Sequence, residues 1–269
     1  MAMKKIVKAV EKVKREYGGV VGNLAMQGRR AADLDIRSVE LSSRQLRKNL
    51  VLRGDEMESA TMAYNMLRTQ LYRVLSENGW TSIGITSANK GEGKSLTSIN
   101  LAYSLARSVQ QSVILVDLDL RRPSISKKLN IEPAVGVGDY FTKNVPLTDV
   151  MFTPGIEGFV IAPGRGSLDN ASELLGAGRL LHLINEIGHK FPSRFVIYDL
   201  PPTLLVDDVM VAAEYIDSFL LVATEGETKK EELKRAVELL EPHNLLGVVL
   251  NKSGESGHGG YYDYYYGED

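Results

Sequence analysis

Residues 82–95 read SIGITSANKGEGKS, a short apolar run that passes into a glycine-containing loop. The run is typical of a strand, and the segment after the loop has helical periodicity. In such a strand–loop–helix unit, Gly91 and Gly93 let backbone N–H groups turn towards phosphate oxygens. Lys94 adds a positive charge, and the hydroxyl of Ser95 suits Mg²⁺. The stretch therefore predicts a phosphate-binding loop, and the alternative is a structural glycine-rich turn.

Short apolar runs alternate with helical stretches along most of the chain. We expect strands at Ser82–Thr86, Val113–Val116, Phe159–Ala162, Phe195–Tyr198, Phe219–Val222 and Leu246–Leu250. We expect helices from Met57 to about Asn78 and near Lys94–Val109, Ser172–Lys190, Val206–Tyr215 and Lys229–Leu240. This alternation predicts an α/β fold with a mostly parallel central sheet and helices on both faces. Because ligands of such sheets bind at the carboxyl ends of the strands, the residues that follow the strands are candidate site residues.

Acidic residues directly follow two of the expected strands. Asp117 and Asp119 come after the second strand, and alternation along an extended chain directs both carboxylates to the same side. Asp199 ends the fourth strand. Carboxylates at these points suit metal ligation and the acceptance of a proton from a hydroxyl group. We attribute the nearby pair Asp207 and Asp208 to N-capping of the next helix.

Three segments resemble, in this order, those of the bacterial tyrosine autokinases of capsule and exopolysaccharide operons: Ala88–Ser95, Asp117–Arg121 and Asp199–Pro202. The similarity covers about residues 57–252, and Gly164 with residues 170–175 is similar to a further stretch of the family. Ala88 stands where the loop usually has its first glycine, and Ala171 stands where proline is usual. The resemblance implies a P-loop NTPase fold like that of the partitioning ATPases. It also implies an ATP-dependent protein-tyrosine kinase that phosphorylates itself and regulates polysaccharide polymerisation or export.

The resemblance also implies roles for individual residues. The catalytic residues would be Lys94, Asp117, Asp119, Arg121 and Asp199. The nucleotide would contact Asn89, Lys90, Gly91, Glu92, Gly93, Lys94, Ser95, Leu96 and, at the adenine, Asn251. The Mg²⁺ ligands would be Ser95, Asp117 and Asp199. Asp119 is our candidate proton acceptor because a free tyrosine hydroxyl, with a pKa near ~10, needs one at neutral pH, whereas Lys94 and Arg121 would stabilise phosphate charge.

The end of the chain is rich in tyrosine. Five of the twelve tyrosines lie in the last nine residues: Tyr261, Tyr262, Tyr264, Tyr265 and Tyr266. Composition alone leaves two interpretations, a low-complexity end and a tail whose tyrosines are used. With the family resemblance, we expect these tyrosines to be autophosphorylation sites, phosphorylated in trans by a neighbouring copy. Residues 253–269 extend at most roughly 55 Å, which permits transfer to a neighbour or within one chain.

Composition limits the partners. Lys and Arg number 32 and Asp and Glu number 34, so the formal net charge of -2 gives no overall basic field for nucleic acid. There is no cysteine, which excludes a disulfide framework and thiolate metal sites. No run approaches the roughly 18 apolar residues of a membrane-spanning helix. We therefore expect a cytoplasmic protein that does not bind nucleic acid.

We divide the chain into three parts: residues 1–56, a kinase domain at 57–252, and a flexible tail at 253–269. Residues 3–17 combine apolar positions at helical spacing with a cluster of lysines. This basic amphipathic helix suits contact with acidic lipid, and the alternative is a solvated or core-docked helix. Residues 20–55 show no sustained period, and we interpret them as an extension or linker.

The resemblance implies partners as well. A membrane chain-length-determinant protein, also called a polysaccharide co-polymerase, would activate the kinase and place it peripherally at the inner face of the membrane. Self-association and a tyrosine phosphatase are also expected. The family's oligomerising helix carries a glutamate and two arginines at three-residue spacing. Those positions here are Met62, Asn65 and Arg68, so only the last is kept.

Two alternatives to the kinase differ from it in recognisable features. The partitioning and cell-division-site ATPases have a signature lysine where this chain has Asn89. The second alternative is a nucleotide-switched scaffold in which the tyrosine-rich tail is an aromatic docking segment. The Asp-x-Asp-x-Arg segment and the tail favour the kinase.

Overall fold

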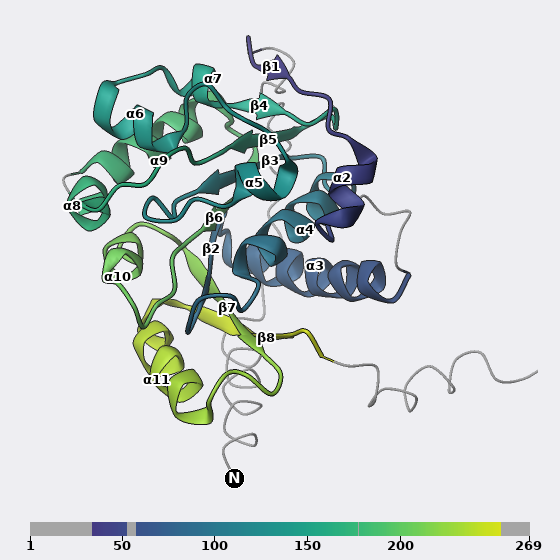
Figure 1. Cartoon of the computed structure of the whole chain (residues 1–269), viewed down its shortest axis with the longest axis vertical. Coiled ribbons are helices and arrows are strands. Elements are labelled where there is room, and N and C mark those ends of the chain that lie inside the picture. Colours follow the sequence, from purple (N-terminus) through teal and green to yellow (C-terminus); the bar gives the residue numbers. More distant parts are fainter. Residues whose placement is uncertain (1–33, 53–57, 177, 254–269) are drawn as a thin grey trace, which may run out of the picture.

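The computed structural model of the chain describes residues 34–52, 58–176 and 178–253 (Figure 1). The expected basic helix at residues 3–17 and the tail tyrosines at 261–266 lie outside these ranges. Within them, no helix is both long enough and apolar enough to cross a membrane.

The described residues form one sheet surrounded by helices. The strands are β1 (Arg37–Ser38), β2 (Ser82–Ser87), β3 (Ser112–Asp117), β4 (Phe152–Thr153), β5 (Phe159–Ala162), β6 (Arg194–Asp199), β7 (Ser218–Thr224) and β8 (Leu245–Asn251). The helices of the amino-terminal half are α2 (Ser43–Lys48), α3 (Glu58–Asn78), α4 (Lys94–Ala106), α5 (Ile125–Leu129) and α6 (Val137–Lys143). The helices of the other half are α7 (Leu147–Val150), α8 (Ala171–Gly176), α9 (Arg179–Lys190), α10 (Asp208–Ala212), α11 (Lys230–Leu240) and the 3₁₀ turn η2 (Glu241–His243).

The sheet is mixed but mostly parallel. Its strand order is β1-β4-β5-β3-β6-β2-β7-β8. The six strands from β5 to β8 in this order pair in parallel, whereas β4 runs antiparallel to β5 and pairs in parallel with β1. The expected fold class is therefore confirmed. The carboxyl ends of β2, β3, β6, β7 and β8 lie along one edge of the sheet, because parallel strands share their direction.

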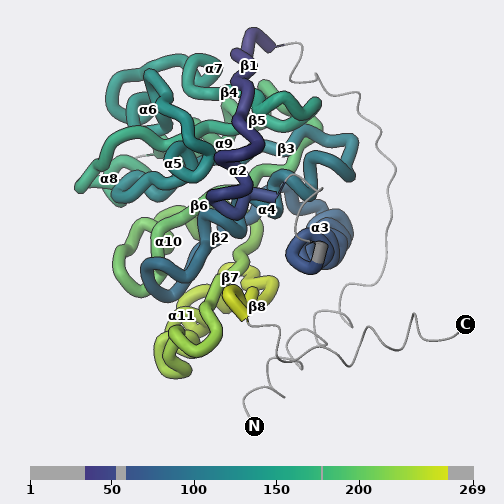
Figure 2. Tube along the Cα trace, turned by 45° about the vertical axis from the view of Figure 1, so that its right-hand side comes forward, coloured from purple at the N-terminus to yellow at the C-terminus, as the bar shows by residue number. Residues whose placement is uncertain are grey.

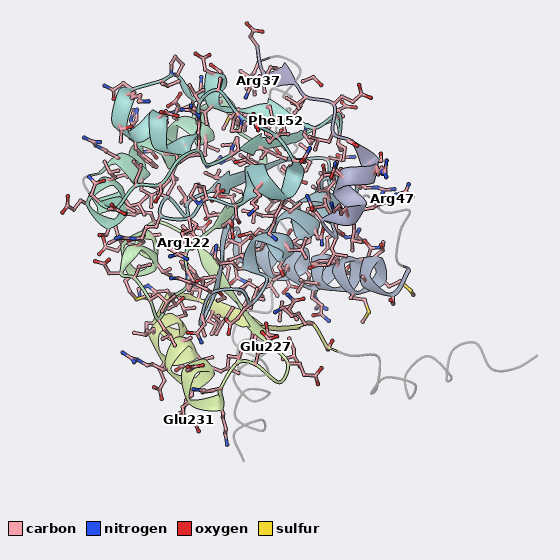
Figure 3. All side chains as sticks on the ribbon, in the orientation of Figure 1. Arg37, Arg47, Arg122, Phe152, Glu227 and Glu231 are labelled. Carbon is pink, nitrogen blue, oxygen red and sulfur yellow. The ribbon has the colours of Figure 1, made fainter. Side chains whose placement is uncertain are left out.

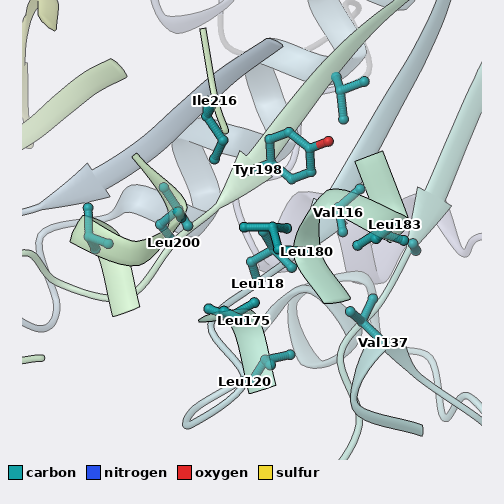
Figure 4. Packing of buried hydrophobic residues seen from close by; sticks show 14 of the residues in the cluster. Val116, Leu118, Leu120, Val137, Leu175, Leu180, Leu183, Tyr198, Leu200 and Ile216 are labelled. Carbon is teal, nitrogen blue, oxygen red and sulfur yellow. The ribbon is translucent and has the colours of Figure 1, made fainter. Parts of the chain in front are cut away.

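Helices cover both faces of the sheet, and each face has its own apolar core. Along β3, Val113 and Leu115 pack in the cluster with α3 and α4, whereas Ile114 and Val116 pack in the cluster with α8 and α9. This is the two-residue alternation of a strand buried on both faces. Figure 4 shows part of the second cluster around Tyr198, and Figure 2 shows α3 on the opposite side of the molecule from α8.

Residues 34–52, which we interpreted as part of an extension or linker, pack against the domain. β1 adds an edge strand, and the side chains of Leu46 and Val51 are fully buried. The N–H of Leu52 donates to the side-chain oxygen of Asn100 at 2.9 Å, and the amide of Asn100 donates to the carbonyl of Leu50 at 3.2 Å. A two-residue strand and a six-residue helix are too short to show a period in the sequence.

The expected helix at residues 172–190 is two helices, α8 and α9. α8 ends at Gly176 and α9 begins at Arg179, and Gly178, just before α9, has a left-handed φ of 71°. Glycine has the lowest helix propensity after proline, and the left-handed conformation cannot continue a helix. The other expected helices and all six expected strands are present; β5 has the expected ends, whereas the ends of the others are shifted.

Candidate functional site

The loop between β2 and α4 has the geometry of an anion cradle. Gly91 and Gly93 have φ values of 82° and 93°, a conformation that residues with a side chain rarely adopt. A Cβ on Gly93 would overlap Nδ2 of Asn251, so a larger residue would displace that side chain from its hydrogen bond to the loop. α4 begins at Lys94, and its free N–H groups carry partial positive charge. These features favour binding of phosphate at the loop.

Lys94 lies between two of the predicted carboxylates. Its Nζ is 2.9 Å from Oδ2 of Asp119 and 3.5 Å from Oδ1 of Asp199, and it donates to the hydroxyl of Ser95 at 3.3 Å. Burial by itself lowers the pKa of Lys94, but the charges of Asp199 and Asp119 outweigh that effect and raise it above its usual value. Lys94 is therefore a protonated cation. The carboxyl ends of β2, β3 and β6 thus bring three predicted site residues together: Lys94, Asp119 and Asp199.

Asp117 and Asp199 are completely buried and each has one oxygen without a hydrogen-bond donor among the described residues. Oδ2 of Asp117 accepts the backbone N–H groups of Ser124 and Ile125 at 3.0 and 3.1 Å. Oδ1 of Asp199 accepts the hydroxyl of Ser98 at 3.2 Å. Buried polar atoms without a partner are rare in folded proteins, and a bound metal ion is one partner that would satisfy carboxylate oxygens of this kind. The two free oxygens are Oδ1 of Asp117 and Oδ2 of Asp199.

The residues fit the Mg²⁺ that a P-loop implies. In the described part of the chain, no group of three or more histidine, aspartate and glutamate side chains forms a metal site by itself. Mg²⁺ usually takes one or two carboxylates and completes its shell with phosphate oxygens and water. Asp117, Asp199 and the hydroxyl of the nearly buried Ser95 match that requirement, since two carboxylate oxygens have no other donor.

The electrostatics of the two buried acids predict a pH-dependent stability. Burial, followed by the charge of Asp199, raises the pKa of Asp117 to about 8, and burial also raises the pKa of Asp199. The unfolded chain releases these protons near pH ~3.9, whereas the native state keeps the proton of Asp117 up to about pH 8. Across this window the native state binds more protons, so stability falls as the pH rises.

We therefore expect the nucleotide-free protein to melt at a lower temperature at pH ~8.5 than at pH ~5.5. Asp117→Asn should reduce this difference, because the amide does not titrate but still accepts the N–H groups of Ser124 and Ile125. Thermal denaturation in a chelator, at both pH values, measures the effect. Equal pH slopes in the two proteins would contradict the prediction.

Arg121 makes contacts that are separate from those of Lys94 with Asp119 and Asp199. Its guanidinium donates to both carboxylate oxygens of Asp208, with the shortest distance of 3.0 Å from Nε, and to the carbonyl of Asp169 at 2.6 Å. Asp207 is the N-cap residue of α10 but its side chain makes no capping hydrogen bond, and Asp208 is the fully buried first residue of the helix. Our N-capping interpretation is therefore wrong for Asp208, whose carboxylate is the counter-ion of Arg121. Contact of Arg121 with phosphate stays a prediction.

The other predicted nucleotide contacts lie around the same loop. Lys90 and Gly91 are exposed, whereas Leu96 is partly buried against the apolar core that includes α3. Glu92 is nearly buried, and the amide nitrogen of Asn251 donates to its carbonyl at 2.9 Å. That nitrogen is thus committed to the loop, and the contact of Asn251 with adenine stays a prediction.

The loop after β5 closes over Asp117. A Cβ on Gly164 would lie 2.2 Å from Cβ of Pro123 and 3.1 Å from the carboxyl carbon of Asp117, so only glycine allows this approach. The N–H of Leu168 donates to the carbonyl of Leu120 at 2.9 Å, which holds the loop against the segment after β3.

Sequence reasoning missed three groups that support the site. They are the carboxylate of Asp208, the hydroxyl of Ser98 and the hydroxyl of Thr228, which donates to Glu92. Arg121 at the strand ends and the acidic pair Asp207 and Asp208 at the start of α10 could have suggested the ion pair between Arg121 and Asp208. Nothing in the sequence pattern singles out Ser98 or Thr228.

The one retained position of the family's oligomerising helix faces inward. Nη1 of Arg68 donates to the hydroxyl of Ser108 at 2.6 Å and to Oδ1 of Asn65 at 3.2 Å. Both partners belong to the same chain, and Ser108 follows α4. Met62, at the glutamate position, is 41% exposed. Arg68 therefore fastens α3 to its own domain.

Comparison with known proteins agrees with this geometry. Residues 83–265 match the family model of the CobQ/CobB/MinD/ParA nucleotide binding domain. The chain is 28% identical over 222 residues to the tyrosine-protein kinase YwqD of Bacillus subtilis, covering 81% of this chain and 92% of that protein. It is 32% identical over 196 residues to the tyrosine-protein kinase CpsD of Streptococcus agalactiae, covering 72% and 82%.

A solved structure also matches. The kinase domain of the Escherichia coli tyrosine kinase ETK superposes with a TM-score of 0.69 at 27% identity, covering 86% of this chain and 94% of that chain. Residues 83–265, which the family model matches, contain the phosphate loop, the acidic ends of β3 and β6, and Asn251. The chain therefore belongs to the bacterial tyrosine-protein kinases, within the CobQ/CobB/MinD/ParA family of nucleotide-binding domains.

Proposed function

We propose that this protein is an ATP- and Mg²⁺-dependent protein-tyrosine kinase that phosphorylates its own carboxyl-terminal tyrosine cluster. One observation carries the proposal. Lys94 lies within 2.9 Å of Asp119 and 3.5 Å of Asp199, beside the phosphate loop, and two buried carboxylate oxygens have no donor in the described chain. A cationic group, a proton acceptor and free metal ligands at one point suit phosphoryl transfer to a hydroxyl.

The chemistry we propose is an in-line displacement. The tyrosine oxygen forms a bond to the γ-phosphorus as the bond from that phosphorus to the bridging oxygen breaks, and ADP leaves. Asp119 accepts the phenolic proton. Lys94 and the N-terminus of α4 offset the negative charge on the phosphates. Mg²⁺, held by Asp117, Asp199 and Ser95, would neutralise further phosphate charge when bound.

The contact between Lys94 and Asp119 has a consequence for proton acceptance. A phosphate group at the loop competes with Asp119 for the same ammonium group. Phosphate that hydrogen-bonds to Lys94 would therefore leave Oδ2 of Asp119 free to accept the phenolic proton. Asp119 also accepts the N–H of Arg122 at 3.0 Å, which keeps the carboxylate oriented.

The tail is the substrate that we propose. β8 ends at Asn251, on the same edge of the sheet as the phosphate loop, and Asn251 touches that loop. The proposed sites are Tyr261, Tyr262, Tyr264, Tyr265 and Tyr266. We infer transfer in trans, with self-association of the kinase.

Incubation with Mg-ATP followed by intact-mass measurement tests the function. We expect mass increments of phosphate units confined to the tail peptide and absent from the Lys94→Met variant. Lys94 is essential because it is the cation at the phosphates. Hydrolysis or binding of ATP without any mass increment would instead support a regulatory ATPase or a nucleotide-switched scaffold.

A mixing experiment tests transfer in trans. The Lys94→Met protein retains its tail but lacks activity, and a protein truncated after Ser253 retains its site but lacks the tail. In a mixture of the two, we expect the tail of the Lys94→Met protein to become phosphorylated. An unlabelled tail, with the full-length wild type labelled in parallel, would show transfer within one chain.

The biological setting follows from the family resemblance. We propose a membrane chain-length-determinant protein as activator and a tyrosine phosphatase that reverses the modification. The kinase would then act in the cytoplasm at the inner face of the membrane and regulate polysaccharide polymerisation or export. Co-purification with the candidate activator, followed by a comparison of phosphorylation rates, tests this setting.

A further inference from the structure

Glu92 is a buried carboxylate inside the phosphate loop. Its side chain and backbone together are 4% exposed, and it has no ion-pair partner among the described residues. Its Oε2 accepts the N–H of Asn89 at 2.9 Å, and its Oε1 accepts the hydroxyl of Thr228 at 2.5 Å. Burial of a carboxylate is costly unless hydrogen bonds compensate. A negative charge beside a site for phosphates also opposes their binding, so a role in holding phosphate does not explain this carboxylate.

The backbone of Glu92 is fastened to the same part of the sheet. Its carbonyl accepts Nδ2 of Asn251 at 2.9 Å and the hydroxyl of Thr224 at 3.4 Å. Thr224 and Asn251 are paired residues at the ends of β7 and β8. Glu92 therefore connects the loop to β7 and to β8, the strand from which the tail continues.

The turn between β7 and α11 is itself ordered by the group that binds Glu92. The hydroxyl of Thr228 accepts the N–H of Thr224 at 2.8 Å while it donates to Glu92. A second contact runs in parallel, because the amide of Asn89 donates to Glu232 of α11 at 2.9 Å. The loop is thus held at two of its residues, Glu92 by the turn between β7 and α11 and Asn89 by α11 itself.

We propose that Glu92 is a positioning residue, which sets the shape of the phosphate loop by fastening it to the β7–α11 turn and to the start of the tail strand. The inference rests on the proposed nucleotide site. The hydrogen bonds of Glu92, rather than its charge, are what nucleotide binding requires. Glu92 contacts neither the reacting atoms nor the tyrosine.

Two substitutions of Glu92 separate hydrogen bonding from charge. Glu92→Ala removes both side-chain hydrogen bonds, and we expect it to weaken binding of Mg-ADP by about tenfold. Glu92→Gln still accepts the N–H of Asn89 with its oxygen and donates from its nitrogen to the oxygen of Thr228. We expect its affinity to stay within about threefold of the wild type or to become tighter, because a negative charge beside the phosphates is gone. Isothermal titration of the full-length proteins measures both.

Glu227, labelled in Figure 3, provides the matched control, since it lies on the same turn, its side chain is 64% exposed and it pairs with Lys252. Glu227→Ala and Glu227→Gln should both bind Mg-ADP like the wild type. Thr228→Val should weaken binding about threefold, and its effect should be smaller when it is added to Glu92→Ala, because the contact between the two residues is already lost there.

The kinetic readout distinguishes positioning from a general loss of structure. For Glu92→Ala we expect a raised KM for ATP with kcat largely retained at saturating ATP, and Glu92→Gln should restore the KM. Tighter binding by both Glu92 variants would overturn the proposal in favour of a pure charge effect. A lower melting temperature of Glu92→Ala with unchanged affinity would overturn it in favour of a purely structural role.

The titration is independent of phosphoryl transfer. Wild-type protein that binds Mg-ADP but does not phosphorylate its tail would contradict the proposed kinase function and leave the role of Glu92 standing. Wild-type protein that does not bind Mg-ADP would contradict both.

Discussion

Asp119→Asn is expected to lower tail phosphorylation by at least about a hundredfold while Mg-ATP binding stays close to that of the wild type. Asparagine keeps the shape of the side chain and still accepts the N–H of Arg122, which Asp119 accepts at 3.0 Å. It cannot take the proton of the attacking tyrosine. Loss of one negative charge 2.9 Å from Lys94 does not weaken phosphate binding, because it leaves the lysine more available. Single-turnover phosphorylation and a separate nucleotide titration measure the two effects.

An exposed aspartate provides the control for this experiment. Asp149 lies on α7, away from the phosphate loop, and Asp149→Asn should be phosphorylated at the wild-type rate. Persistent phosphorylation of the Asp119→Asn protein would remove Asp119 from the mechanism. A parallel loss of nucleotide binding would assign Asp119 to binding instead of proton transfer.

Arg121→Ala is expected to lower the free energy of unfolding by about 3–5 kcal/mol, because it leaves the carboxylate of Asp208 buried without its counter-ion. Asp208 is fully buried, whereas the side chain of Arg121 is 28% exposed. The exposed pair of Arg73 and Glu77 supplies a control, since Arg73→Ala should cost less than about 1 kcal/mol. Urea denaturation of each variant without nucleotide gives these values.

A double replacement separates the structural role of Arg121 from a catalytic one. Arg121→Met with Asp208→Leu removes both charges, and such apolar replacements of a buried pair are often neutral in stability. We expect the double variant to recover most of the lost stability. If Arg121 only holds α10 and the carbonyl of Asp169 in place, activity should recover with it. A stable double variant that binds nucleotide but does not phosphorylate would instead place Arg121 at the phosphates, as its sequence position predicts.

The central strands could be predicted from the sequence because each is a run of apolar and β-branched residues buried on both faces. β2 and β3, for example, differ from their predicted ranges only at their ends. β1 and β4 were not predicted, since two residues carry no period and β4 contributes only Phe152 and Thr153. The break between α8 and α9 was also missed, although Gly176 and Gly178 mark it. The apolar spacing that predicted one helix does not show the left-handed φ of Gly178, which a continuous helix cannot contain.

The placement of the site could be predicted further than the contacts within it. Parallel strands bring their carboxyl ends to one edge, so the approach of Lys94 to Asp119 and Asp199 follows from topology. The direction in which a side chain points does not follow from topology. Arg121 turns to Asp208, and Asn251 turns to the phosphate loop, because each finds a hydrogen-bond partner that comes from a distant part of the chain. Such pairs leave no spacing pattern in a single sequence.

The strand order places β1 and β8 at opposite edges of the sheet. With neighbouring strands about 4.8 Å apart, the two edges are separated by roughly 30 Å or somewhat more. An anchor on the chain ahead of β1 would therefore attach the domain at the edge remote from β8. Attachment at that edge would leave the β8 edge, from which the chain continues towards the tyrosines, clear of the anchor.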